Sequence, residues 1–223
     1  MLTPPLTDVE VRILGSLAEK AVTTPDNYPL SISALAAACN QTTSREPVMR
    51  LEEGIILESI VTLRRRSLLR AIQPAGSRVT KYLHLLDEAL DLDAREIAVL
   101  GVLMLRGAQT LGELHSRTTR LAEFVDVAAV EATLNSLVSR ESGALAVQMQ
   151  RRAGQKELRY AHLLSGEPSA HTDRDSQSDV NEQVAGVARS LDRVAELERV
   201  VTELRAELTE LHAQFAAFRA EFQ

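Results

Sequence analysis

The chain has 223 residues and a hydrophobic content of 45%, which predicts one or two globular domains that each bury a modest core. An aromatic content of 3% and the absence of Trp indicate that those cores consist of aliphatic side chains. The formal net charge of −6 excludes a nucleic-acid-binding protein that is basic over its whole surface, so any basic region must be local.

The single cysteine, Cys39, excludes a disulfide within the chain and suits a reducing compartment. The N-terminus shows no basic segment followed by an apolar run, which is the pattern of a secretory signal. The longest apolar stretch, 97–105, is about half as long as a membrane helix and is typical of a buried helix. We therefore expect a cytoplasmic protein with no membrane partner.

The first elements along the chain are three predicted helices. Thr7, with Glu10 three residues later, has the spacing of a capping box, and Pro25 marks a position where the first helix has ended. The other two helices are expected after Ser31 or Ser33 and from Leu51 towards Arg66.

A β-hairpin is predicted next, because two strand-like runs, 68–73 and 78–86, flank the turn sequence Pro74-Ala75-Gly76-Ser77. Three helices followed by a hairpin is the element order of a winged helix, a variant of the helix-turn-helix in which the hairpin forms the wing.

The same order then repeats. The segment 6–15 reappears as 92–101, and the string Tyr82-Leu83-His84-Leu85-Leu86 reappears as Tyr160-Ala161-His162-Leu163-Leu164. The second set of helices is expected after Asp93, ending at Gly107, after Thr110 and after Asp126. Strands are expected at 145–150 and 158–164. In the first of them Leu145, Val147 and Met149 alternate with Ala146, Gln148 and Gln150, as in a half-buried strand.

The C-terminal part has a different character. The segment from Ser165 to about Asp179 is rich in Ser, Asp, Gly and Pro, which predicts a flexible linker at 167–181. Residues 182–223 carry a heptad repeat that predicts a coiled-coil helix and a homodimer. The residues expected at the dimer contact are Val194, Leu197, Val201, Leu204, Leu208, Leu211, Phe215 and Phe218. A single amphipathic helix that folds back on the rest of the chain is the alternative.

These patterns predict a mainly α fold with small β-hairpins, of the α+β class. Its parts are two tandem winged-helix domains, 1–88 and 89–166, a linker, 167–181, and a coiled-coil helix, 182–223.

A local basic region supports contact with double-stranded DNA. No acidic residue lies between Arg64 and Lys81, a segment that ends the third helix and covers the wing. The expected nucleic-acid contacts are Ser44, Arg45, Arg64, Arg65, Arg66, Arg70, Arg78 and Lys81. The alternative is that these are ordinary solvated arginines at a helix C-terminus and on an exposed hairpin.

The acidic starts of both third helices oppose the reading of a DNA sequence. Glu52, Glu53 and Glu58 in the first copy, and Asp126 and Glu131 in the second, lie where base-contacting side chains normally begin. A protein-binding adaptor with no direct DNA contact is therefore the competing hypothesis for function.

No arrangement in the sequence predicts an enzyme, a cofactor or a metal site. His84 and His162 hold matching places in the two copies, which a repeated structural position explains. Gly-rich phosphate loops, nucleophile motifs and metal-ligand spacings are absent from the sequence. A non-enzymatic regulatory or architectural protein is the leading expectation.

Several long and unusual strings carry a family resemblance. They are Thr24-Pro25, Tyr28-Pro29-Leu30, Cys39-Asn40-Gln41, Ser44-Arg45-Glu46-Pro47-Val48, the segment 76–82, Leu105-Arg106-Gly107-Ala108-Gln109-Thr110, Gly112-Glu113-Leu114 and Arg117-Thr118. In these residues the chain resembles the YceH-like family of uncharacterised bacterial proteins, over about 6–166. The resemblance implies two tandem winged-helix domains in a bacterial cytoplasmic protein, and it implies no established activity.

Overall fold

The first half of the chain folds as helices followed by a hairpin, in the predicted order. Our computed structural model describes residues 3–76, 78–150 and 157–168, all within one compact unit, Met1–Thr172. The elements of the first half are α1 (Asp8–Thr23), the short 3₁₀ helix η1 (Pro25–Asn27), α2 (Ile32–Cys39), α3 (Glu53–Arg65), β1 (Leu69–Ile72), β2 (Lys81–His84) and α4 (Leu86–Leu90). The predicted coiled-coil contacts from Val194 to Phe218 lie outside the described residues.

The second half repeats this plan with small differences. Its elements are α5 (Ala94–Arg106), β3 (Gln109–Thr110), α6 (Leu111–Thr118), α7 (Val127–Val138), β4 (Ala146–Gln148) and β5 (Arg159–His162). β5 lies between β3 and β4 in a three-stranded antiparallel sheet, whereas β1 and β2 form a two-stranded one. The chain is therefore of the α+β class, with helices and small antiparallel sheets.

The predicted starts of α1 and α5 are confirmed by their caps. The Thr7 hydroxyl accepts from the backbone N–H of Glu10 at 3.2 Å, and the Glu10 carboxylate accepts from the backbone N–H of Thr7 at 2.8 Å. Asp93 with Glu96 forms an equivalent capping box at the start of α5. Each box satisfies backbone donors that a helix start would otherwise leave without partners.

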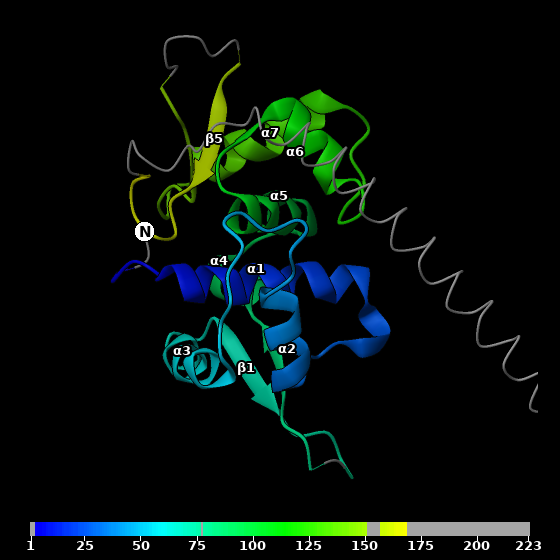
Figure 1. The fold of residues 1–223 in the computed structure, drawn as a ribbon. Coiled ribbons are helices and arrows are strands. Elements are labelled where there is room, and N and C mark those ends of the chain that lie inside the picture. Colours follow the sequence, from blue (N-terminus) through cyan, green and yellow to red (C-terminus); the bar gives the residue numbers. More distant parts are fainter. Residues whose placement is uncertain (1–2, 77, 151–156, 169–223) are drawn as a thin grey trace, which may run out of the picture. The chain divides into compact units, whose positions relative to one another are not determined.

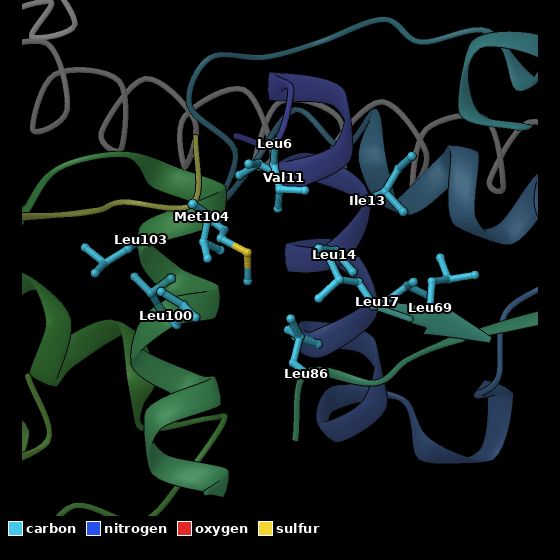
Figure 2. Close-up of a cluster of buried hydrophobic side chains, with 14 of the residues drawn as sticks. Leu6, Val11, Ile13, Leu14, Leu17, Leu69, Leu86, Leu100, Leu103 and Met104 are labelled. Carbon is cyan, nitrogen blue, oxygen red and sulfur yellow. The ribbon is translucent and has the colours of Figure 1, made fainter. Parts of the chain in front are cut away.

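The two halves share one core, with α1 and α5 at its centre. Figure 1 shows these two helices side by side, with α2, α3 and β1 on one side and α6, α7 and β5 on the other. α1 packs more extensively against α5 than against any helix of its own half. Figure 2 shows Leu14 and Leu17 of α1 facing the same interior as Leu100 and Met104 of α5.

The α1–α5 contact is reciprocal. Gly15 of α1 lies against α5, and a Cβ placed there would meet Met104 and Leu105 at 3.0–3.1 Å. Gly101, the counterpart of Gly15 in the repeat, lies against α1, where its nearest neighbour is Ala18, the counterpart of Met104. Equivalent residues thus occupy equivalent places on both sides of the seam, as in a two-fold symmetric dimer.

Strand β4 departs from the predicted alternation. Leu145 and Ala146 are both buried, whereas Val147 is only half-buried, so the expectation that Ala146 faces outward is wrong. The strand is short and is held on two sides, because the Leu145 N–H donates to Leu137 at the end of α7 and the Leu145 carbonyl accepts from Leu163 after β5. Neither face near Ala146 is left to solvent.

Candidate nucleic-acid interface

The end of α3 carries the first basic residues of the predicted surface. Arg64 and Arg65 form the last turn of the helix, and Arg66 is its C-cap. The helix dipole favours positive charge at this end, which accounts for the cluster on structural grounds alone. Arg64 and Arg65 are exposed, whereas Arg66 donates through Nη2 to the carbonyl oxygen of Pro4 at 2.6 Å and is partly engaged.

The hairpin presents Arg70 and Lys81 on one face. Side chains alternate between the two faces of a strand pair, and the buried Leu69 and Tyr82 occupy the face that packs on the core. Arg70 follows Leu69 in β1, and Lys81 precedes Tyr82 in β2, so both belong to the opposite, outward face. Arg78 is exposed in the loop that leads into β2.

An open depression of about 470 Å³ joins the end of α3 to the hairpin and α4. Arg64 and Arg70 both line it, together with Glu88 and the apolar side chains of Leu69 and Leu85. The Arg70 guanidinium lies 3.1 Å from the Glu88 carboxylate, with side-chain exposures of 52% and 60%. Because such an exposed pair contributes at most about 1 kcal/mol, Glu88 is a weak competitor for any anion that approaches Arg70.

Arg45 does not belong to this surface, so its predicted contact with nucleic acid is wrong. Its side chain is 0% exposed, and its Nη2 lies 2.6 Å from Oε2 of Glu19 in α1. Its Nε donates to the carbonyl oxygen of Ala38 at 3.1 Å. A charge desolvated to this degree is held inside the protein by its partner.

The connector between α2 and α3 explains this placement. It runs towards α5, where the Glu46 N–H donates to the carbonyl oxygen of Leu105 at 2.8 Å. Ser44, which has a positive φ of 59°, accepts from the Arg106 guanidinium at 2.6 Å through its hydroxyl. Ser44 therefore joins the two halves of the chain, in addition to any role at the surface.

Sequence reasoning missed a second buried arginine, Arg12. It is 2% exposed and donates to the carbonyl oxygens of Cys39 at 3.2 Å and Pro47 at 2.6 Å. Burial, and then the neighbouring Arg45 charge, lower its pKa from the usual value. One indication of this burial was present in the sequence, because Arg12 lies between Val11 and Ile13 on a side of the helix that is otherwise apolar.

The outward side of α3 is acidic and aliphatic over most of its length. Glu53 and Glu58 are exposed, and so are the large side chains of Ile55, Leu57 and Val61. Aliphatic groups at this position offer few hydrogen bonds to base edges, and carboxylates repel phosphate.

The described residues of α7 and β5 offer less to a nucleic acid than α3 and the first hairpin do. The helix α7, which corresponds to α3, contains no Lys or Arg, and its exposed residues include Val127, Ala128 and Glu131. Arg159 of β5 donates to the Ala108 carbonyl oxygen at 2.8 Å and to the Glu113 carboxylate at 3.2 Å. The basic residues of the second hairpin turn, Arg151, Arg152 and Lys156, lie outside the described residues.

The two equivalent histidines have structural environments. The Nδ1 of His84 accepts from the Leu86 N–H at 3.3 Å, and the His84 N–H donates to the hydroxyl of Tyr28 at 2.9 Å. Burial lowers the pKa of His84, and it lowers the pKa of His162 to about 4. Burial also raises the pKa of the Tyr28 hydroxyl to about 12 and the pKa of the Cys39 thiol. All four groups are therefore neutral near pH 7.

The described residues contain neither a cluster of metal ligands nor a membrane-spanning helix. Among the described residues, no three His, Cys, Asp or Glu side chains lie close enough together to hold a metal ion. Within the same part of the chain, every helix is too short or too polar to span a membrane.

A protein-family model matches the chain over most of its length. It covers residues 6–155, which is most of the duplicated region and includes α1, α5 and the basic hairpin. The chain belongs to the DUF480 family, a family of proteins of unknown function.

Proposed function

We propose that the chain is a non-enzymatic cytoplasmic protein built of two winged-helix modules, and that the first module contacts double-stranded DNA through phosphates. The order of three main helices and a hairpin in each half supports the winged-helix description, with β1 and β2 as the first wing. The 13 residues between α2 and α3, 40–52, form a longer connector than the usual helix-turn-helix turn, and they are used to hold α5.

The observation that carries the proposal is the convergence of basic side chains beside the hairpin. Arg64 and Arg70 line one depression, and Lys81 shares the outward face of the hairpin with Arg70. With Arg65, Arg66 and Arg78 close in sequence and no carboxylate between 64 and 81, this surface suits a run of phosphates.

The binding mode is expected to be weakly dependent on DNA sequence. The α3 side chains that would reach base edges are aliphatic or acidic, whereas the basic ones lie at the helix end and on the hairpin, where they meet the backbone. Because α7 lacks the basic end of α3, the surface that we propose belongs to the first module of each chain. Two surfaces would act together if the heptad tail pairs two chains, which would raise the apparent affinity.

A salt titration with duplex DNA tests the proposal. Binding of the full chain, followed by fluorescence anisotropy, should weaken steeply as salt rises. The double variant Arg70→Ala/Lys81→Ala should bind about tenfold more weakly, and the slope of log K against log salt should fall by about 2. The matched control Arg50→Ala/Arg120→Ala removes the same charge from other exposed positions and should bind like the wild type. Undetectable binding of the wild type at low salt would rule the proposal out.

The predicted tail contact has its own test. Light scattering should give a dimer mass for the full chain and a monomer mass for a chain that ends at Gly166. The substitution Leu204→Arg in the full chain should also give a monomer, because a charge at a core heptad position disfavours pairing. A monomeric full chain would refute the tail's role.

A second candidate function, protein binding, is supported by the outward side of α3. Its exposed aliphatic residues and carboxylates suit a protein partner better than DNA. An affinity pull-down with and without nuclease separates the two functions, because partners that vanish with the nucleic acid would count against a protein adaptor.

A further inference from the structure

The outward stripe of α3 has a defined composition. Gly54, Glu58, Val61 and Arg65 recur at intervals of three or four residues and are all exposed, whereas the opposite side of the helix carries the fully buried Ile56 and Leu63. Leu57 borders the stripe one turn before Val61. These four residues and Leu57 form one continuous surface, which we call the α3 strip.

The middle of the α3 strip is aliphatic. Leu57 is 42% exposed and Val61 is 45% exposed, although both are large enough to favour burial. The surface around Gly54 is unoccupied, since a Cβ placed at this residue would have no neighbour within 4 Å. A side chain from another molecule therefore has room to lie across Gly54.

The charges on the α3 strip and beside it have opposite signs at the two ends of the helix. Glu53 and Glu58 lie in the N-terminal half, and Arg65 lies in the last turn. Within the described part of the chain, none of these three side chains forms an ion pair. The helix dipole accounts for Glu53 and Arg65 at the helix ends, but it does not account for Glu58 in the middle.

A helix with this polarity is complementary to itself in an antiparallel arrangement. If two copies cross about a two-fold axis near Ser59, the basic end of each lies beside the acidic half of the other. Arg65 of the second copy then lies over Gly54, between Glu53 and Glu58. Leu57 and Val61 of both copies meet at the centre and exclude water from it.

We propose that the α3 strip binds the α3 strip of a second copy of this chain, through two symmetric Arg65–Glu58 contacts around an aliphatic centre. The proposal deepens the second candidate function by naming the partner. It assigns Arg65 to protein contact and leaves Arg64, Arg70 and Lys81 for phosphate. The equivalent helix α7 has the acidic Glu131 and no basic residue, so it lacks this self-complementarity.

The size of the strip predicts a weak contact. A single helix pair buries less than the roughly 1,200 Å² of a standard stable interface, so the isolated contact should have a dissociation constant in the micromolar range or weaker. Because two charge pairs contribute, the association should also weaken as salt rises.

Charge reversal in the full chain tests the proposal without DNA. Sedimentation velocity at low salt, over a wide range of protein concentration, measures the self-association of chains that carry Leu204→Arg, which removes the predicted tail contact, with and without further substitutions in the α3 strip. Glu58→Arg and Arg65→Glu should each weaken the association by about tenfold or more, because the symmetry places like charges together twice. The double variant Glu58→Arg/Arg65→Glu should recover it to within about threefold, since opposite charges then face each other again.

The matched controls separate this contact from others. Glu131→Arg on α7 makes the same charge change on the equivalent helix and should leave the association unchanged. Leu57→Ser/Val61→Ser should abolish it, with an unchanged circular dichroism spectrum, because both side chains are exposed. The proposal is overturned if the Leu204→Arg chain with an intact α3 strip shows no salt-sensitive association, if the single reversals have no effect, or if the double reversal associates as weakly as the single ones. None of these outcomes depends on DNA binding, so the two proposals fail separately.

Discussion

The reciprocal glycines of the α1–α5 seam predict opposite effects for the same substitution at equivalent positions. In Gly15→Ala the new methyl group would lie 3.0 Å from Leu105 Cγ and Cδ2 and 3.1 Å from Met104 Cβ, so the helices must separate slightly. In Gly101→Ala the nearest atom is the Ala18 Cβ at 3.9 Å, an ordinary van der Waals contact.

The magnitudes follow from two opposing terms. Replacing Gly by Ala inside a helix stabilises it by about 0.5–1 kcal/mol, and this term applies at both sites. Overpacking a tight core costs about 1–3 kcal/mol, and this term applies only at Gly15. We expect Gly101→Ala to stabilise the protein by up to about 1 kcal/mol and Gly15→Ala to destabilise it by about 1 kcal/mol.

Urea unfolding of the two variants, followed by circular dichroism, measures both changes against the wild type. The two free energies of unfolding should differ by about 2 kcal/mol, which exceeds the error of values derived from urea midpoints when the m-values agree. If both substitutions shifted the free energy of unfolding in the same direction by similar amounts, the described seam would be wrong.

Three further predictions follow from buried or paired charges. Burial holds the pKa of His162 at about 4 in the folded protein, against 6.5 in the unfolded chain, so the unfolded state binds the proton first as the pH falls. The free energy of unfolding should therefore be unaffected by this group above pH 6.5 and should decrease by up to about 3 kcal/mol as the pH falls to 4. Urea midpoints across this pH range should fall less for His162→Gln, and an equal fall would assign the loss to other groups. Glu88→Gln should tighten DNA binding by up to about fivefold, because it frees Arg70 from an exposed ion pair and removes a negative charge beside the bound phosphates. Weaker binding of this variant in an anisotropy titration would contradict the placement of Arg70 at the phosphate contact. Glu19→Ala should destabilise the protein by about 3–5 kcal/mol, because it leaves the buried Arg45 without its carboxylate; a loss in thermal unfolding smaller than about 1 kcal/mol would contradict a buried pair.

Local signals in the sequence predicted the elements of the fold well. The caps Thr7, Asp93 and Thr110 each satisfy backbone donors within three residues, so their effect depends on nearby sequence alone. The hairpin after residue 66 was equally accessible, because a turn sequence separates two apolar runs. The short elements α4 and β3 were not predicted, since so few residues carry no periodic pattern.

Long-range contacts account for what the sequence did not reveal. The position of Arg45 depends on a connector that is held by Leu105, some sixty residues away, and on Glu19 in α1. The central place of α1 was hidden because Glu10 and Arg12 interrupt its apolar pattern, although both are buried and hydrogen-bonded. For the candidate site, the sequence located the basic segment, but only the strand register shows that Arg70 and Lys81 share a face.

The matched glycines at the centre of the molecule also bear on how such a chain could arise. A half-length ancestor with one seam helix would have paired with its own copy, glycine against the facing helix on both sides. Fusion of two such genes would make that pairing permanent and free each half to diverge. The basic last turn of α3, which the equivalent helix α7 lacks, is the kind of difference that such freedom allows.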